Sequence, residues 1–560
     1  MGIIHNGQEI PNELNILQEK WKLKSVWGEK KPEIPSMCIF NNISEALDML
    51  HKHIMLNSLM CFHTDVDVDG IGTTYIFKKS LENLGSNNHI LLINKDKIHG
   101  IQQKHVDYFN NKRLDLMIIT DSSCNEIDII KQFNCDVLVI DHHELLHDDL
   151  CGTCNDGVHK YVIVNNTISN SNQERDNLWL RSKNISAFEN IEPYIGNSDM
   201  SCGLVVYELL RVYCECFANP KLLENMLLFQ WVGVTLFTDV INTLNDRNQW
   251  YLDKTVFNMD TEASIRIMMQ NINKFKASLD KSYIQYSFAP LINKTIRAGE
   301  SSKALSTVIN SPGNVTELSL YNELQQSAVD KVINVEYIEP ETGIRRIAKR
   351  TFNQKNIVLD ISKLGISPNY SGVIASRLAG DNSKNTAVYI MTETGLCKGS
   401  FRGKYKDVDY RKYFADYSND IYAQGHPGAF GFELTQEQLD SIMNTLYTIE
   451  PDEDKKPWLT LGNMKPEEYG IYHINSLDEF KRQGYIWMIA TGNAKVTSRD
   501  EIVIRVKASD VVLKSTVGKL FIYDVLGMEC KAFKPLSGEY FNVYIEYTNE
   551  ISMYIREQER

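Results

Sequence analysis

The chain has 560 residues and a mass of 64.2 kDa, which predicts three or four domains of ordinary size. Its mean hydropathy of −0.29 and the absence of any apolar run of 18 residues argue against a membrane-spanning protein. The first residues lack the features of a signal peptide, and 11 cysteines are too few for a disulfide scaffold, so we expect a cytoplasmic protein. The net charge of −13 argues against a general nucleic-acid coat, but it is compatible with an enzyme whose carboxylates bind cations.

The first half of the chain predicts an N-terminal arm over residues 1–45, with a plausible helix at 9–24, and a first domain over 46–250. In this domain, short apolar runs alternate with segments of helical periodicity, such as 70–85, which ends at a glycine. The apolar runs are typical of buried parallel strands and lie at 58–62, 89–94, 114–120, 135–140 and 160–164. Repeated alternation of this kind predicts an α/β fold with a doubly wound parallel sheet.

Three further parts follow. Residues 251–345 have long helical periods, for example at 273–286, and predict a helical connector. Residues 346–450 predict a second α/β domain, with strands at 356–361 and 386–391 and a helix at 433–449. A charged linker at 450–456 precedes a small β-rich module over 457–560, where short strand-like runs include 484–490.

Acidic and imidazole side chains gather where three predicted strands of the first domain end. Because the carboxyl ends of parallel strands share one edge of a sheet, we expect these side chains to converge there. Carboxylates in such number repel one another unless cations are bound, and mixed carboxylate and imidazole ligands suit manganese or magnesium. The residues are His63, Asp65, Asp67 and Asp69 after the first strand, Asp121 after the second, and Asp141, His142 and His143 after the third.

Each pattern also has a simpler interpretation. The run from Asp65 to Gly70 resembles the start of an EF-hand loop, but Ile76 stands where that loop needs a glutamate, and a strand precedes the run. A histidine at a strand end is by itself more often a satisfied polar residue than a ligand. Cys151 and Cys154 could form half of a zinc site, but no standard second half follows, so ordinary loop cysteines are favoured.

Seven segments in order resemble the DHH phosphoesterase superfamily, and most of all its RecJ branch of single-strand-specific exonucleases. They are HTDVDVDG (63–70), TDSS (120–123), VIDHHE (139–144), MSCGLVVYELL (200–210), WVGVTLFTDVINTLNDRN (231–248), APLINKTIRAGE (289–300), and the accessory-domain group NYSGVIASRLAG, KGSFRG and QGHPGAFG. The resemblance covers about 45–450. Two departures are the histidine at position 63, which the RecJ branch generally lacks, and Gln424 in place of the first glycine of the accessory Gly-Gly-His motif.

The resemblance implies a site with two divalent cations, manganese preferred and magnesium possible. One ion would be held by Asp67 with either His63 or Asp65. The other would be held by Asp69, His142 and Asp239, with Asp121 bridging both ions. His143 would contact the scissile phosphate, and Asp141 would orient the histidines. The substrate-binding residues that it implies are Asn293, Arg297, Arg377, Ser400, Arg402, Lys404, Gly425 and His426.

Basic residues of the second α/β domain indicate a path for a nucleic-acid strand. One group comprises Arg345, Arg346, Lys349, Arg350 and Lys355. A second comprises Lys398, Arg402, Lys404, Lys406, Arg411 and Lys412, interleaved with Phe401, Tyr405, Tyr410 and Tyr413. Charge combined with aromatic stacking is a common means of holding single strands, although a solvated charged face is the simpler explanation for any one group.

The favoured function is a single-stranded DNA exonuclease of RecJ type, running 5′ to 3′ and releasing mononucleotides; direction and DNA preference come from the resemblance. One alternative is a phosphodiesterase acting on nanoRNA or cyclic dinucleotides, which His63 favours mildly. Another is a non-catalytic DHH-fold protein that binds single strands. The expected partners are single-stranded DNA and, through the C-terminal β module, replication or repair proteins; no membrane partner is expected.

Overall fold

The structure is a computed structural model. It describes most of residues 35–446. The gaps in this range are 96–97, 147–148, 184–193, 198, 240, 242–245, 255–261, 273–283, 285–287, 339–344, 405–407, 416–421 and 427. Outside this range it describes residues 4–5, 8–9, 494–496, 502–517, 520–525, 528–532, 535–538, 540–547 and 551–557. Internal contacts divide the chain into two units. The larger unit comprises 33–404 and 409–447, and the smaller comprises 1–32, 405–408 and 448–560.

A six-stranded sheet forms the centre of the first domain, as the apolar runs predict. Its order is β4 (His89–Ile93), β3 (Met60–Thr64), β5 (Leu116–Thr120), β6 (Asp136–Asp141), β8 (Lys160–Asn165) and β7 (Cys151–Thr153). All neighbours pair in parallel except β7, which is antiparallel to β8 at the edge. Strands β3, β5 and β6 are buried along their whole length, which explains their continuous apolar sequences.

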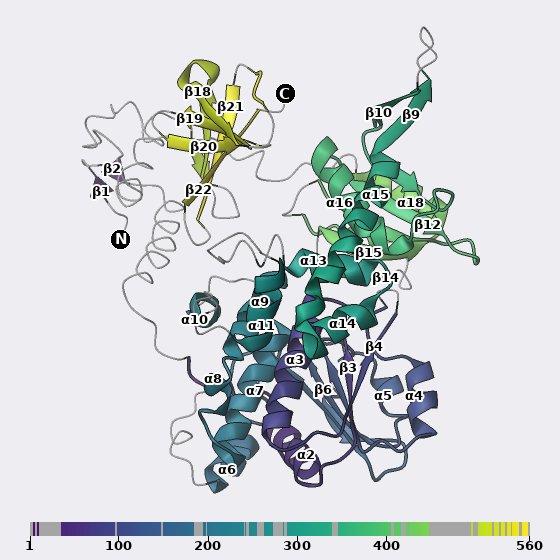
Figure 1. Cartoon of the computed structure of the whole chain (residues 1–560), viewed down its shortest axis with the longest axis vertical. Helices are drawn as coiled ribbons and strands as arrows, with labels where there is room; N and C mark the ends of the chain where they lie inside the picture. Colours follow the sequence, from purple (N-terminus) through teal and green to yellow (C-terminus); the bar gives the residue numbers. More distant parts are fainter. Residues whose placement is uncertain are drawn as a thin grey trace. The chain divides into compact units, whose positions relative to one another are not determined.

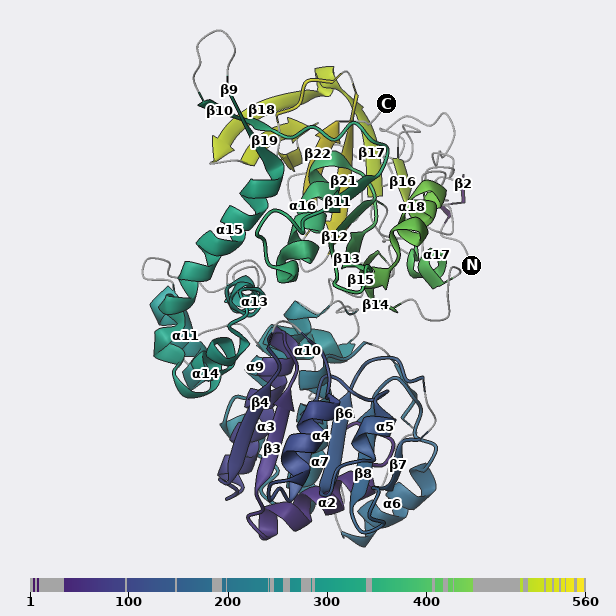
Figure 2. The same ribbon diagram turned by 90° about the vertical axis from the view of Figure 1, so that its right-hand side faces the viewer.

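Helices cover both faces of this sheet, which confirms the doubly wound α/β fold (Figures 1 and 2). One core lies between the sheet and the helices α2 (Ile43–Met55), α3 (Val68–Asn83), α7 (Cys202–Phe217) and α9 (Phe229–Thr238). The other lies under α4 (Gln103–Asn110) and α5 (Ile127–Ile130). Helix α3 ends as predicted, because Gly85 follows it with a φ of 94°, a conformation that glycine adopts without strain.

Further helices extend the first domain and form the connector. The first domain also contains α6 (Gln173–Ser182), α8 (Leu222–Asn225) and α10 (Asp246–Lys254). The connector contains α11 (Ala263–Ile272), α13 (Ala289–Arg297), α14 (Ser301–Asn310), η3 (Pro312–Ser319) and α15 (Leu320–Ile333). A hairpin of β9 (Asn334–Ile338) and β10 (Arg345–Lys349), which the periodicity does not predict, follows α15 directly.

The second α/β domain is built on a five-stranded sheet. Its order is β11 (Ile357–Asp360), β12 (Thr386–Met391), β13 (Cys397–Arg402), β15 (Ala429–Leu434) and β14 (Tyr422–His426). Only β11 and β12 pair in parallel. The helical segments are η4 (Pro368–Tyr370), α16 (Ser371–Asn382), α17 (Arg411–Ala415) and α18 (Gln436–Thr445), and α18 begins with a capping box between Thr435 and Gln438.

The smaller unit is all-β where the structure describes it. Strands β1 (Ile4–His5) and β2 (Gln8–Glu9) form one pair. A seven-stranded sheet has the order β16 (Ala494–Val496), β17 (Ile502–Lys507), β21 (Tyr540–Tyr547), β22 (Ile551–Glu557), β20 (Met528–Ala532), β19 (Leu520–Val525) and β18 (Val511–Val517), with the short η9 (Ala508–Asp510) before β18. This confirms the predicted β-rich module.

Several predicted elements lie outside the described residues. They are the helix at 9–24 apart from Glu9, the helix at 273–286 apart from Ile284, the linker at 450–456 and the strand at 484–490. Among the helices that the structure does describe, none combines the length and the apolar character needed to cross a membrane.

Candidate metal centre

The carboxyl ends of β3, β5 and β6 bring the predicted acidic and imidazole residues together. Asp65 and Asp67 follow β3, Asp121 follows β5, and His142 follows β6; the three strands are direct neighbours in the sheet. Oδ1 of Asp67 also caps α3 by accepting a hydrogen bond of 2.9 Å from the N–H of Gly70. A Cβ at Gly70 would lie 2.7 Å from the carbonyl oxygen of Asp65, so the turn after β3 requires glycine here.

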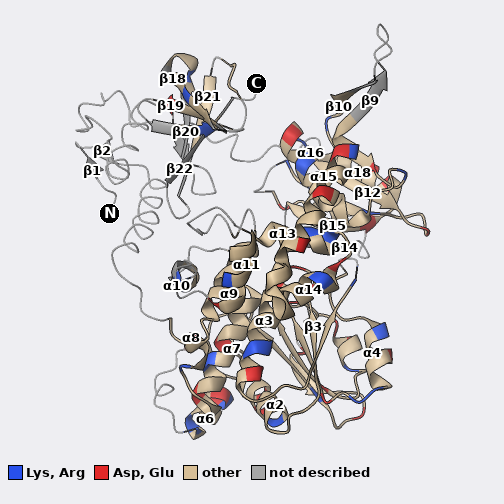
Figure 3. Ribbon diagram, in the orientation of Figure 1, with Lys and Arg blue, Asp and Glu red and all other residues tan. Residues whose placement is uncertain are grey.

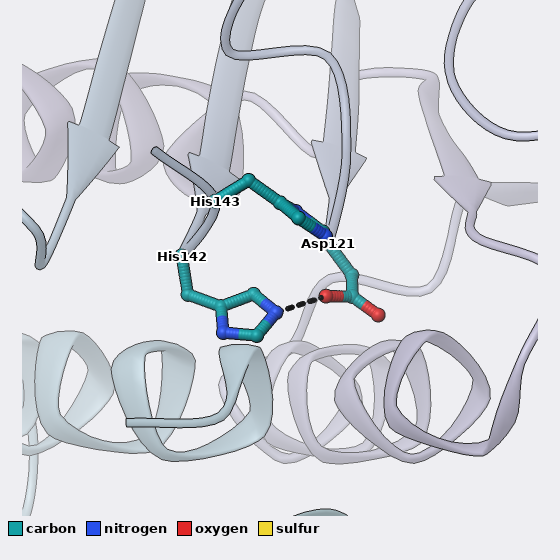
Figure 4. Close-up of side chains that lie close together, drawn as sticks. All are labelled: Asp121, His142 and His143. Atoms are coloured by element: carbon teal, nitrogen blue, oxygen red, sulfur yellow. Dashed lines mark ion pairs between the residues drawn. The ribbon is translucent and has the colours of Figure 1, made fainter. Parts of the chain in front are cut away.

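Asp121 and His142 face each other at the centre of this edge (Figure 4). Nδ1 of His142 lies 2.9 Å from the carbonyl oxygen of Met200, which can only accept, so Nδ1 carries a proton and Nε2 is the nitrogen that could bind a cation. Nε2 lies 3.0 Å from Oδ1 of Asp121, a buried atom that accepts no hydrogen bond from the described residues. Two electron-pair donors at this distance are compatible with a cation held between them.

Burial and neighbouring carboxylates destabilise the negative charge of the central residues. Burial raises the pKa of Asp121 well above its usual range, and the charges of Asp69, Asp67, Asp65 and Asp141 raise it further. Burial and the neighbouring negative charges therefore both favour the protonated carboxyl of Asp121 over its carboxylate. A bound divalent cation would reverse this preference, because it would offset the repulsion among the carboxylates.

The N-terminus of α7 holds Asp69. Ser201 caps that helix, and the N–H groups of Cys202 and Gly203 donate to the two carboxylate oxygens of Asp69 at 2.8 and 3.1 Å. Burial nevertheless raises the pKa of Asp69 to about 7; His142 and the Cys202 N–H lower it, while Asp239 and Asp67 raise it. The helix therefore fixes the position of a carboxylate whose negative charge burial still disfavours.

Asp239 comes from a fourth element and completes the set of ligand candidates. It is the residue after α9, and its Oδ2 lies 3.4 Å from Nδ1 of His142. Three groups each bring ligand atoms within 4.8 Å of one another: Asp65, Asp67 and Asp121; Asp69, His142 and Asp239; and Asp121, His142 and His143. The first two correspond to the two predicted ion sites, and none of the three includes Cys151 or Cys154. The oxygen and imidazole donors fit a divalent cation such as manganese or magnesium.

His143 differs from His142 in its exposure and in its partner. Its side chain is 59% exposed, and its Nδ1 lies 2.7 Å from Oδ1 of Asp141. The charge of the Asp141 carboxylate and its hydrogen bond raise the pKa of His143 to about 10. Although burial disfavours the charged form of Asp141, the interaction with His143 and the N–H of Cys124 hold its pKa below the usual range. Asp141 therefore holds the imidazole of His143 and the backbone of the turn after β6 through hydrogen bonds.

The structure separates the two candidates for the first ion site. His63 belongs to none of the three ligand groups. Its side chain is fully buried, Nε2 lies 3.3 Å from the amide nitrogen of Asn94, and the ring packs against His105. Burial lowers the pKa of His63 to about 3, with smaller effects of His105 and Lys104. Asp65, in contrast, lies with Asp67 and Asp121.

Sequence reasoning missed one residue at this edge. Nδ1 of His99 lies 2.6 Å from Oδ2 of Asp65, and the N–H of Gly100 is 3.4 Å from the other oxygen. Both residues lie in the loop after β4, between the strand and α4. A single histidine in a polar loop has no periodicity or spacing that would have indicated this contact.

A second cluster, suited to anions, forms around Arg402 on β13. Burial lowers the pKa of Arg402 to about 10, and nearby Arg297 lowers it further. Its guanidinium donates to Oγ of Ser376 at 2.8 Å and to the carbonyl of Phe401, and Arg297 donates to Gln325 at 3.2 Å. Within the described part of the chain, neither arginine has a carboxylate at ion-pair distance. Two such arginines favour a bound anion.

The start of α16 contributes to this anion cluster. Oγ of Ser371, the first residue of the helix, lies 2.9 Å from Oγ of Ser400 on β13. A Cβ at Gly372 would lie 3.1 Å from a terminal nitrogen of Arg402 and 3.4 Å from Oγ of Ser400, so glycine lets β13 approach the helix start closely. The N-terminal end of a helix together with hydroxyl and guanidinium donors is a suitable environment for phosphate.

The other predicted substrate residues occupy varied positions. Asn293 lies half-buried on α13, next to Lys294. Arg377 pairs at 3.0 Å with Asp381 one turn later on α16, and it is largely exposed. The N–H of Lys404 donates to Asn385. Gly425 and His426 lie on β14, opposite Phe430 and Ala429, but the side chain of His426 lies outside the described ones.

The expectation that aromatic residues around Arg402 stack on bases is wrong for two of them. Phe401 and Tyr410 are fully buried and pack against each other, with Phe414 and Phe430 beside Phe401. Alternation along β13 turns Phe401 towards the core while Arg402 faces the other way.

Two cations of the same predicted group have acidic partners. Lys398 pairs with Glu433 and Arg411 pairs with Asp409, and Figure 3 shows acidic and basic residues on the same helices of the larger unit. Tyr405 and Lys406 lie outside the described residues.

Comparison with known proteins places this arrangement in a recognised fold. No family model matches the sequence. YorK of Bacillus subtilis (strain 168), an SPbeta prophage-derived protein assigned as a single-strand DNA-specific exonuclease, is 22% identical over 433 residues, which cover 72% of this chain and 68% of YorK. Its counterpart from Bacillus phage SPbeta matches equally.

Solved structures show the same fold. RecJ of Thermus thermophilus in complex with Mn²⁺ superposes with a TM-score of 0.63 at 15% identity, covering 99% of this chain and 79% of that one. An exonuclease RecJ bound to manganese gives a TM-score of 0.52 at 17% identity over 75% of this chain and 97% of that one. The chain therefore has the fold of these RecJ structures, as the resemblance drawn from its motifs implies.

Proposed function

We propose that the chain is a two-metal phosphodiesterase that degrades single-stranded DNA from its 5′ end and releases mononucleotides. The observation that carries this proposal is the convergence of six ligand residues on one sheet edge, around a buried Asp121 oxygen that accepts no hydrogen bond from the described residues. Similarity to single-strand-specific exonucleases supports the substrate, and direction and product are taken from that likeness.

In this proposal Asp65, Asp67 and Asp121 would hold one ion, and Asp69, His142 and Asp239 would hold the other. Asp65 rather than His63 completes the first site, because His63 is enclosed between Asn94 and His105. Two bound divalent cations would activate water and stabilise charge on the attacked phosphate. Manganese is preferred over magnesium, because Mg²⁺ usually keeps several waters and binds only one or two carboxylates, whereas this site offers more protein ligands.

The remaining residues bind and orient the substrate. His143, which Asp141 holds in place and keeps protonated near neutral pH, donates a hydrogen bond to an oxygen of the scissile phosphate. Arg402, Arg297 and the hydroxyl of Ser400 bind a second phosphate of the strand. The backbone N–H groups of Cys202 and Gly203 keep Asp69 in position while substrate enters and product leaves.

The test is an incubation of the full chain with Mn²⁺ and three substrates: single-stranded DNA labelled at either end, an RNA dinucleotide and a cyclic dinucleotide. We expect mononucleotides from the 5′ end of DNA and a fall of more than about 100-fold in kcat/KM on Asp121→Ala. Preferred hydrolysis of the short substrates would instead establish the small-substrate phosphodiesterase. Binding of DNA without hydrolysis of any substrate would establish the non-catalytic alternative.

A further inference from the structure

An open groove of about 940 Å³ lies outside the metal centre, between α13, α15 and the β9–β10 hairpin. Its polar lining consists mainly of three cations and three side-chain amides: Lys294, Lys331, Arg350, Asn322, Gln326 and Asn334. All six belong to the larger unit, and none of them is used in the mechanism above.

The cations of the groove are available to an anionic ligand. Lys331 and Arg350 have no carboxylate at ion-pair distance among the described residues, and Nζ of Lys294 donates to Oδ1 of Asn322 at 2.6 Å. The two carboxylates in the lining are Glu323 and Asp330, and Asp330 already accepts a hydrogen bond of 2.9 Å from Gln326. Three cations against two carboxylates leave the groove with a net positive charge.

The groove also offers what a nucleic-acid base requires. Ile347 on β10 lines the groove, and its side chain is 69% exposed. The three side-chain amides can donate hydrogen bonds to base edges and accept hydrogen bonds from them. A small anion needs several donors around one point, whereas these cations are spread over two helices and a hairpin with amides between them. That spacing suits a chain in which phosphates alternate with bases.

The groove is connected to the anion cluster around Arg402. Arg297 lies three residues after Lys294 on α13, so the two side chains lie on the same side of the helix. Burial lowers the pKa of both Lys294 and Arg402, and the charge of Arg297 lowers both further, which places Arg297 near each of them. On the hairpin side of the groove, Lys349 at the end of β10 directly precedes Arg350. Cations therefore follow one another from β13 across α13 to the hairpin.

We propose that this groove binds single-stranded nucleic acid outside the metal centre, with phosphates on Lys294, Lys331 and Arg350 and a base against Ile347. The inference rests on the proposed function for the nature of the ligand. It adds a strand-binding surface that would make long substrates bind more tightly than dinucleotides.

The experiment measures binding of a fluorescent 20-nucleotide DNA strand to the full chain in EDTA, over a series of salt concentrations. Lys331→Ala with Arg350→Ala should weaken binding and flatten the slope of log K against log salt by about 1.4, that is, about 0.7 for each of two phosphate contacts. The matched control is Lys112→Ala with Arg113→Ala, which removes the same charge from exposed positions before the amino end of β5. Ile347→Ala should weaken binding without changing the slope.

The inference is wrong if the groove variants and the control variant bind DNA with the same affinity and the same salt slope. It is also wrong if a groove variant loses as much kcat/KM on a dinucleotide as on a long strand. The proposed function fails separately, when the wild-type chain with Mn²⁺ cleaves no strand although it binds one in EDTA.

Discussion

At the scale of single residues, the two adjacent histidines after β6 have different environments and should give different phenotypes. His142 is directed by the carbonyl of Met200 towards Asp121 and Asp69, whereas His143 is exposed and held by Asp141. His142→Ala should lose one of two bound Mn²⁺ ions. His143→Ala should retain both ions and lose about 10²–10³-fold in kcat, the range typical of removing one hydrogen-bond donor to developing charge.

Metal analysis of the two purified variants, together with kcat on single-stranded DNA, decides between these outcomes. His143→Gln is a useful control, because its amide can still donate a hydrogen bond to a phosphate. Equal metal loss in the His142 and His143 variants would show that both histidines are ligands, as the third ligand group allows.

Also at this scale, Asp136 is a buried carboxylate at the opposite end of β6 from the metal centre. It lies 2.9 Å from Nε2 of His53 and 2.8 Å from Nζ of Lys52, both on α2. Burial disfavours its charged form, but His53 and Lys52 outweigh this effect and hold its pKa below the usual range. Because the folded-state pKa is depressed, Asp136 stabilises the fold above the unfolded-state pKa of about 3.9, and this contribution is lost as pH falls.

Asp136→Asn should therefore lower the free energy of unfolding by about 1.5–3 kcal/mol at neutral pH. The difference from wild type should shrink when urea unfolding is repeated below pH 4. Activity on single-stranded DNA should be unchanged in the folded variant, since the residue is remote from the ligand groups. A difference that stays constant with pH would show that the carboxylate charge contributes nothing.

At the scale of elements, α7 and α9 must pack closely for the metal centre to form. The N-terminus of α7 holds Asp69, and Asp239 follows the end of α9. A Cβ at Gly203 on α7 would lie 2.4 Å from Oγ1 of Thr235 on α9, so the distance between the helices depends on this glycine. Oγ of Ser201 and Oγ1 of Thr235 are also 2.9 Å apart.

Gly203→Ala should destabilise the protein by about 1–3 kcal/mol through overpacking, and it should weaken Mn²⁺ binding because α9 carries Asp239. Denaturant unfolding and a Mn²⁺ titration measure the two effects. Gly380→Ala on α16 is the control, because a Cβ there meets nothing within 4 Å and the substitution should be neutral or slightly stabilising. Equal behaviour of the two variants would mean that the helices adjust without cost.

At the scale of the whole molecule, the contacts of the chain form two units, and only the larger one contains the candidate metal centre. A ligand that binds only the folded state stabilises the unit that binds it, by about 2.7 kcal/mol at 100 times Kd. Calorimetry of the full chain should therefore show one transition that moves to higher temperature with Mn²⁺ and another that does not. In Asp121→Ala the first shift should be much smaller. A shift of both transitions by the same amount would show that the units unfold together.

The fold class and most residues of the candidate metal centre could be predicted from the amino-acid pattern. Buried parallel strands are continuously apolar, so β3, β5 and β6 were visible, and the residues that follow them had to meet at one sheet edge. Only the resemblance to a family joined Asp239 to them, because that residue lies more than 90 positions further along the chain than His142.

Which side chains share an environment became clear only from the packing of the elements. The folded chain encloses His63 within β3 and brings Asp65 beside Asp67 and Asp121. The two residues differ because β3 ends at Thr64, so Asp65 lies in the turn that leads to α3. It also places His99 against Asp65 and turns Phe401 and Tyr410 into the core. Sequence could not predict these positions, because a polar loop and a cluster of mixed residues have no hydrophobic periodicity. Local pattern specifies the elements, whereas contacts between residues far apart in sequence depend on how those elements pack.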